Sequence, residues 1–107
     1  MNTLETLYQV VLDRKARPQE GSYTCYLFDK GLDKILKKVG EECAETIIAA
    51  KNERQEETVG ELSDLIYHLL VMMAAQDIPL EAVLENLERR SHKIGNLKQR
   101  KQVDRET

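Results

Sequence analysis

Residues 37–51 read KKVGEECAETIIAAK and residues 61–73 read ELSDLIYHLLVMM, and these two stretches decide the fold. Each carries apolar side chains three and four residues apart, which is the spacing of an amphipathic α-helix. The polar run NERQEE at 52–57 is short, so the two helices should form an antiparallel hairpin. The sequence therefore predicts an all-α protein built around two long neighbouring helices.

The first of these helices should run from Leu32 to about Asn52 and the second should follow the polar run. The apolar positions expected to share one side of the first helix are Leu32, Ile35, Leu36, Val39, Cys43, Ile47 and Ala50. Those expected on the facing side of the second helix are Val59, Leu62, Leu65, Ile66, Leu69, Leu70 and Met73.

Shorter helical patterns flank this pair. A helix over residues 3–15 is indicated by Leu4, Leu7, Tyr8 and Val11, with Asn2 and Glu5 spaced as a capping box. Residues 16–22 should form a loop, and a short helical turn should cover 23–29. A further helix should follow Pro79, with Leu80, Val83, Leu84, Leu87 and Ile94 repeating the pattern. We predict one domain, 1–107, forming an antiparallel bundle of four to five helices.

Composition limits the class of partner. The chain has 107 residues, of which 41% are apolar and 33% charged, with five Gly and two Pro, as suits packed helices. Its formal net charge is −3, so it lacks a general attraction to nucleic acid or to an anionic membrane. A locally basic tail covers about 96–107, for which a solvated role is the alternative to contact with phosphate.

The compartment is suggested by cysteine usage and by the N-terminus. Cys25 and Cys43 stand far apart and form no C-x-x-C pair, so neither a disulfide framework nor a zinc site is indicated. The first fifteen residues lack the basic flank and apolar run of a signal peptide. The apolar stretch 65–75 is shorter than the roughly 20 residues that a spanning helix needs. A cytoplasmic protein is expected.

The carboxylates of the two long helices should meet. In an antiparallel hairpin, two residues that lie opposite each other have residue numbers that add up to a constant. For a turn near residue 53 that constant is about 106. This register sets Glu45 opposite Glu61 and Glu42 opposite Asp64. Both acidic pairs border the predicted apolar stripes, so four carboxylates should converge at the edge of the core.

Converging carboxylates repel one another, and burying part of their charge costs several kcal/mol unless a cation offsets it. Oxygen ligands select a hard ion, Mg²⁺ or Mn²⁺, and Mg²⁺ leaves positions open for phosphate oxygens. The ferritin-like alternative requires Glu-x-x-His pairs, which His68 and His92 do not complete. The remaining alternative is a solvated charged face on which Lys37 and Lys38 neutralise neighbouring acids.

Three segments together resemble the phosphoribosyl-ATP pyrophosphohydrolase family of the all-α, MazG-like nucleotide pyrophosphatases. They are GSYTCYLFDKG at 21–31, KKVGEECAETIIAAK at 37–51 and ELSDLIYHLLVMM at 61–73. The E-E-x-x-E and E-x-x-D patterns are typical of the superfamily, while the S-Y-T segment and the K-K-V-G-E-E string are more specific to this family. Cys43 departs mildly from the small residue expected there.

The resemblance implies hydrolysis of phosphoribosyl-ATP to phosphoribosyl-AMP and pyrophosphate, the second step of histidine biosynthesis, with Mg²⁺ and in a homodimer. It also implies roles for individual side chains. The expected metal ligands are Glu42, Glu45, Glu61 and Asp64, while Glu41 is a water-mediated ligand or orients the attacking water. Ser22, Tyr23 and Thr24 belong to the resembling segment and are expected on phosphate, ribose or base. Lys38 shares a helix face with Glu42 and Glu45, so it is the first expected phosphate contact and Lys34 the second, with a solvated lysine as the alternative for each. Helix capping by Ser22 or Thr24 is the alternative for that segment, and His68 should make a structural hydrogen bond.

Two other functions compete with this interpretation. One is a house-cleaning (d)NTP pyrophosphatase of the same superfamily, which would favour a dNTP as substrate. The other is a non-enzymatic helical dimerisation module whose acids only solubilise it.

Overall fold

Five helices make up the part of the chain that the computed structural model describes, residues 1–93. In order they are α1 (Thr3–Ala16), α2 (Tyr23–Lys30), α3 (Leu32–Lys51), α4 (Gln55–Ala75) and α5 (Leu80–Ser91). Those residues contain no strand, so the prediction of an all-α bundle is confirmed. The predicted position Ile94 and the basic tail from about 96 lie outside the described residues.

The helix ends follow from local chemistry. Asn2 and Glu5 form the predicted capping box, in which each side chain accepts the backbone N–H of the other residue. The Ser22 hydroxyl caps α2 by accepting the Cys25 N–H at 3.1 Å. Gly31 has φ +97°, which lets the chain turn sharply between α2 and α3 without a side-chain clash. The turn between α3 and α4 contains Glu53 at φ +57°.

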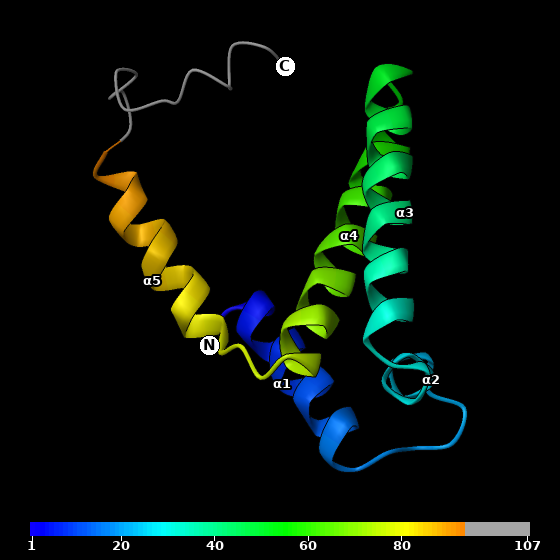
Figure 1. Ribbon diagram of the computed structural model, residues 1–107. Coiled ribbons are helices and arrows are strands. Elements are labelled where there is room, and N and C mark those ends of the chain that lie inside the picture. The colour runs from blue at the N-terminus through cyan, green and yellow to red at the C-terminus, as the bar shows by residue number, and fades with distance from the viewer. Residues whose placement is uncertain (94–107) are drawn as a thin grey trace.

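The long hairpin of α3 and α4 dominates Figure 1, with α1 packed beside α4 and α2 crossing beneath the hairpin. The core lies between α1, α2 and the last turns of α4. Its buried side chains are Tyr8, Val11, Leu27, Ile35, Leu70, Val71, Met73, Ala74 and Leu80. Tyr8 also donates its hydroxyl to the Ile78 carbonyl at 2.6 Å, which fixes the start of α5 against α1.

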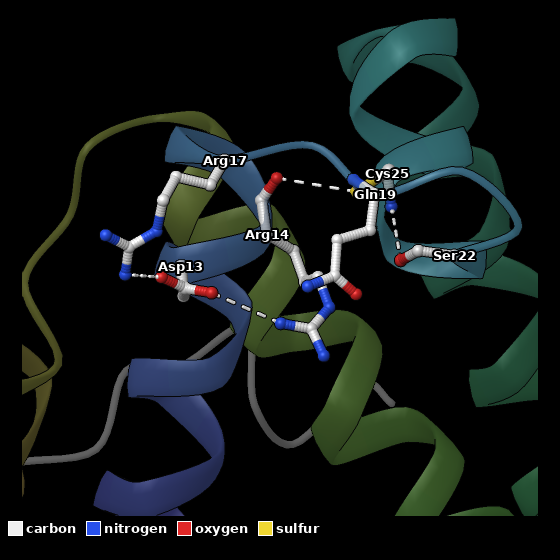
Figure 2. A network of polar contacts seen from close by, with 6 residues as sticks. All are labelled: Asp13, Arg14, Arg17, Gln19, Ser22 and Cys25. Carbon is white, nitrogen blue, oxygen red and sulfur yellow. Dashed lines mark hydrogen bonds and ion pairs between the residues drawn. The ribbon is translucent and has the colours of Figure 1, made fainter.

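A polar network secures α2 to the end of α1 (Figure 2). Asp13 accepts hydrogen bonds from Arg14, at 3.2 Å, and from Arg17. The Cys25 thiol accepts the Gln19 N–H at 3.2 Å and donates to the Arg14 carbonyl at 3.4 Å. The two contacts of Cys25 hold the first turn of α2 against the end of α1 and the loop that follows it.

The predicted apolar stripe of α3 is partly wrong. Leu36 and Ile47 are exposed in this single chain, and Ile47 has an exposed fraction of 68%. The buried side of α3 instead carries Ile35, Glu42 and Ala49. These residues are seven apart, so they lie on one face of the helix, and that face is the one that contacts the rest of the chain.

The last helix projects away from the others (Figure 1). Leu80 is buried in the core and Leu84 packs against it, so the first turns of α5 are anchored. Val83 and Leu87, on the same helix, are exposed.

Among the described residues, α4 alone has the length and apolar composition that crossing a membrane would require. Core helices of soluble proteins meet the same criterion, so this is weak evidence for a span.

Candidate metal centre

Three carboxylates from the hairpin converge midway along it. Ligand atoms of Glu42, Glu45 and Glu61 all lie within 4.8 Å of one another. Glu45 and Glu61 were predicted to lie opposite each other across the hairpin, and the structure brings them together with Glu42. Carboxylate oxygens at such separations suit a hard divalent cation.

Glu42 is the member of this cluster that most requires a cation. Glu42 is only 6% exposed, although it carries a carboxylate. Its Oε1 atom is buried and has no hydrogen-bond partner among residues 1–93, while the nearest cation, Lys38 Nζ, is 3.9 Å from Oε2. A buried carboxylate oxygen without a partner is costly. The donor set and this orphaned atom therefore fit a bound divalent metal.

The electrostatics agree with this geometry. The pKa of Glu42 is raised, first by burial and then by the negative charges of Glu45 and Asp64, with Lys38 opposing them. The pKa of Glu61 is raised by burial and by Glu45. Without a cation, this site disfavours the ionised form of its carboxylates. A bound cation would reverse that preference, because its positive charge stabilises the ionised form.

Asp64 and Glu41 stand at the margin of the cluster. The charge of Asp64 acts on Glu42 and on Glu61, so Asp64 is near both, but it falls outside the group of three that meet within 4.8 Å. Glu41 is exposed and pairs with Lys38 at 3.3 Å. Of the four predicted ligands, three are therefore brought together and Asp64 lies beside them.

Lys38, the first predicted phosphate contact, lies at the edge of the carboxylate cluster. Its ammonium group lies between Glu41 and Glu42, and the hydrogen bond to Glu41 raises its pKa, so it carries a full charge at neutral pH. Lys34 lies one helical turn earlier on α3 and is half-buried. If Lys38 only neutralised acids, its ion pair with Glu41 would be explained. The buried Oε1 atom of Glu42 would still have no hydrogen-bond partner among the described residues.

The Ser22–Thr24 segment separates into three roles. Ser22 caps α2, as the capping alternative anticipated. Thr24 shares a short hydrogen bond with the Tyr67 hydroxyl of α4. Tyr23 is 3.0 Å from His68 Nε2 through its hydroxyl oxygen, and burial raises the pKa of that hydroxyl.

The sequence did not reveal how His68 connects α2 to the acid site. Its ring is 4% exposed, with Nδ1 2.7 Å from the Asp64 carbonyl oxygen and Nε2 3.0 Å from the Tyr23 hydroxyl. The predicted structural hydrogen bond is present, and it has a second partner from α2. The spacing of His68 after Asp64 could have suggested the first contact, whereas the second joins residues 45 positions apart.

Known proteins resemble this chain over nearly its whole length. The family model described as phosphoribosyl-ATP pyrophosphohydrolase matches residues 4–91. The chain is similar to phosphoribosyl-ATP pyrophosphatase of Clostridium botulinum, with 52% identity over 105 residues, or 97% of this chain and 96% of the relative. It is also similar to proteins of the same name from Listeria monocytogenes and Listeria innocua, each 54% identical over 101 residues, or 94% of this chain and 97% of the relative.

Proposed function

This chain belongs to the phosphoribosyl-ATP pyrophosphohydrolase family, and on that premise we propose that Mg²⁺ held between α3 and α4 supports its hydrolysis of phosphoribosyl-ATP. The products are phosphoribosyl-AMP and pyrophosphate, in the second step of histidine biosynthesis. The observation that carries the metal proposal is the orphaned, buried oxygen of Glu42 within a group of three carboxylates. Mn²⁺ suits the same ligands.

Glu42, Glu45 and Glu61 hold the metal in this proposal, and Asp64 completes the set from its place beside them. A bound Mg²⁺ supplies activation of water and neutralisation of phosphate charge. Glu41 lies next to this group on the solvent side and is suited to orienting the attacking water through a hydrogen bond.

Substrate phosphates are the expected partners of the lysines. Lys38 offers a charged amine at the edge of the acid group, and Lys34 offers a second one turn away. Lysine acts as a point charge on a flexible stem, so it can follow the phosphate as the bond to the leaving pyrophosphate breaks. Ser22, Tyr23 and Thr24, at the start of α2, are the further substrate contacts in this proposal.

We also propose that the protein is a homodimer in which the outer face of the hairpin is covered by a second copy. The support is a set of large apolar side chains that one chain leaves in solvent. They are Ile47, Ile48, Val59, Leu62 and Ile66 on α3 and α4, with Val83 and Leu87 on α5. Exposed apolar surface of this extent is typical of protein interfaces.

We propose that the protein is cytoplasmic, as the sequence predicts. Cys25 and Cys43 are both free thiols, as suits a reducing compartment.

The test is release of pyrophosphate from phosphoribosyl-ATP with and without Mg²⁺. Glu42→Gln and Glu61→Gln should each lower kcat/KM by about a hundredfold or more, because metal-ion catalysis is worth several kcal/mol. Glu56→Gln, an exposed position on α4, is the matched control and should stay within about twofold of wild type.

Activity that persists in chelator, or that survives both ligand substitutions, would contradict the metal proposal. Good turnover of a dNTP beside inactivity with phosphoribosyl-ATP would move the function to a house-cleaning pyrophosphatase.

A further inference from the structure

A pocket with two tyrosine rings in its wall lies between the loop after α1 and helix α2. Its volume is about 660 Å³, and its lining comes from residues 18–29, among them Pro18, Glu20, Tyr23, Tyr26 and Asp29. We call it the tyrosine pocket. Sites for small ligands commonly have volumes of roughly 300–1,000 Å³. The tyrosine pocket is therefore large enough for a nucleotide base.

The two tyrosines form an aromatic wall. They stand three residues apart on α2, so they share one face of the helix, and their rings stack with centroids 6.0 Å apart. Tyr23 is nevertheless 45% exposed and Tyr26 43% exposed. The ammonium group of Lys30, which does not line the pocket, lies 5.7 Å from the centre of the Tyr26 ring. This aromatic wall therefore already attracts one cation.

Two carboxylates line the same pocket. Glu20 lies on the loop and Asp29 lies in the last turn of α2, and both are exposed. Neither forms an ion pair with any residue in the range 1–93. The faces of aromatic rings are negative, as ionised carboxylates are. The tyrosine pocket therefore suits a flat ligand that carries a positive charge.

Tyr23 connects the tyrosine pocket to the metal centre. Its ring lines the pocket, and its hydroxyl oxygen lies 3.0 Å from Nε2 of His68 on α4. The Nδ1 atom of the same imidazole lies 2.7 Å from the backbone oxygen of Asp64. A base subsite has to adjoin the place where the phosphates react, and these two contacts provide that continuity.

The substrate of this family carries the charge that the pocket suits. In phosphoribosyl-ATP the second ribose is attached to N1 of the adenine, so N1, C6 and the exocyclic nitrogen form an amidine. An amidine holds a proton at neutral pH, which makes this purine a cation, whereas the bases of ATP and of dNTPs are neutral. All these nucleotides share a triphosphate, so contacts with phosphate alone do not discriminate between them.

We propose that the tyrosine pocket is the base subsite and that it selects the cationic, N1-substituted purine over a neutral base. Tyr23 and Tyr26 contact the flat ring, while Glu20 and Asp29 balance its charge. This inference rests on the proposed function, because it concerns how the substrate of that reaction is told apart from ATP.

The test compares two isomers of one nucleotide, 1-methyl-AMP and N6-methyl-AMP. Each has one phosphate and one added methyl group, but only 1-methyl-AMP is a cation at pH 7. Both are measured as inhibitors of pyrophosphate release from phosphoribosyl-ATP by the Mg²⁺-loaded enzyme. Wild type should bind 1-methyl-AMP about 3- to 10-fold more tightly than N6-methyl-AMP, as expected for a cation on an aromatic face.

Substitutions in the pocket assign that preference to particular side chains. Tyr26→Leu and Asp29→Asn should each reduce the preference to less than about twofold. Tyr26→Phe keeps the aromatic face and should retain it, as should Glu56→Gln, the exposed control on α4. A merely structural disturbance weakens binding of both isomers equally, so it leaves the preference unchanged.

A preference that survives both Tyr26→Leu and Asp29→Asn would overturn the assignment to this pocket. Equal inhibition by the two isomers, or inhibition by neither, in a wild type that hydrolyses phosphoribosyl-ATP with Mg²⁺ would refute this inference and leave the proposed function intact. A wild type that does not hydrolyse phosphoribosyl-ATP would instead refute the proposed function.

Discussion

Replacing Glu42 by Gln should stabilise the metal-free protein and at the same time remove its stabilisation by Mg²⁺. The substitution keeps the size of the side chain and deletes its charge. Glu42 is buried, one of its oxygens has no partner among the described residues, and two neighbouring acids raise its pKa. Its charge is therefore unfavourable until a cation arrives.

The expected stabilisation of the metal-free protein by Glu42→Gln follows from the distances between Glu42 and the neighbouring charges. Ligand atoms of Glu42 and Glu45 lie within 4.8 Å, where two like charges repel by about 1 kcal/mol in water and about 3 kcal/mol in surroundings typical of a protein surface. Attraction to Lys38 at 3.9 Å offsets a similar amount, while Asp64 and burial add to the cost. A net gain of about 1 kcal/mol remains, which is about 4–8 °C in Tm for a domain of this size.

Thermal unfolding at fixed protein concentration measures both effects. Wild type should gain about 2.7 kcal/mol at a Mg²⁺ concentration one hundred times its Kd, and Glu42→Gln should gain much less. The Glu56→Gln control should resemble wild type with and without Mg²⁺. If Glu42→Gln leaves the metal-free Tm unchanged and keeps the full Mg²⁺ shift, the reasoning is refuted.

Three further predictions concern pH, phosphate binding and assembly. Because the pKa of Glu42 is raised in the native state, that state holds more protons than the unfolded chain, so metal-free stability should fall as pH rises above about 4.5, more steeply in wild type than in Glu42→Gln. Urea titrations from pH 4 to 8 measure this, and equal slopes would contradict it. Lys38→Ala should lower kcat/KM for phosphoribosyl-ATP about tenfold or more, as for loss of a charged hydrogen bond, and unchanged kinetics would exclude a phosphate contact. Ile47→Asp or Leu62→Asp should halve the molar mass in light scattering toward 12.3 kDa, whereas Val10→Asp on α1 should not; a wild-type monomer would remove the dimer proposal.

Much of this architecture could be predicted from the sequence because it depends on local rules. Helical periodicity and the short polar link define the hairpin, and the hairpin fixes which residues lie opposite each other. Glu45 and Glu61 meet for that reason. The capping box at Asn2 follows from neighbours three residues apart.

The buried face of α3 could not be predicted in the same way. The helix carries more apolar residues than one chain can cover, and periodicity does not say which of them contact the same chain. Leu36 and Ile47 belong to the exposed side, whereas Glu42 lies on the inner one. The pairing of Tyr23 with His68 was equally inaccessible, because it depends on how α2 crosses the hairpin and not on spacing along the chain.

The most direct test of the metal centre is anomalous diffraction from crystals grown with millimolar Mn²⁺. The account predicts one or more peaks bounded by the carboxylates of Glu42, Glu45 and Glu61, with Asp64 at the edge and the inner oxygen of Glu42 as a ligand. No peak at that position, with these side chains turned toward solvent, would contradict it.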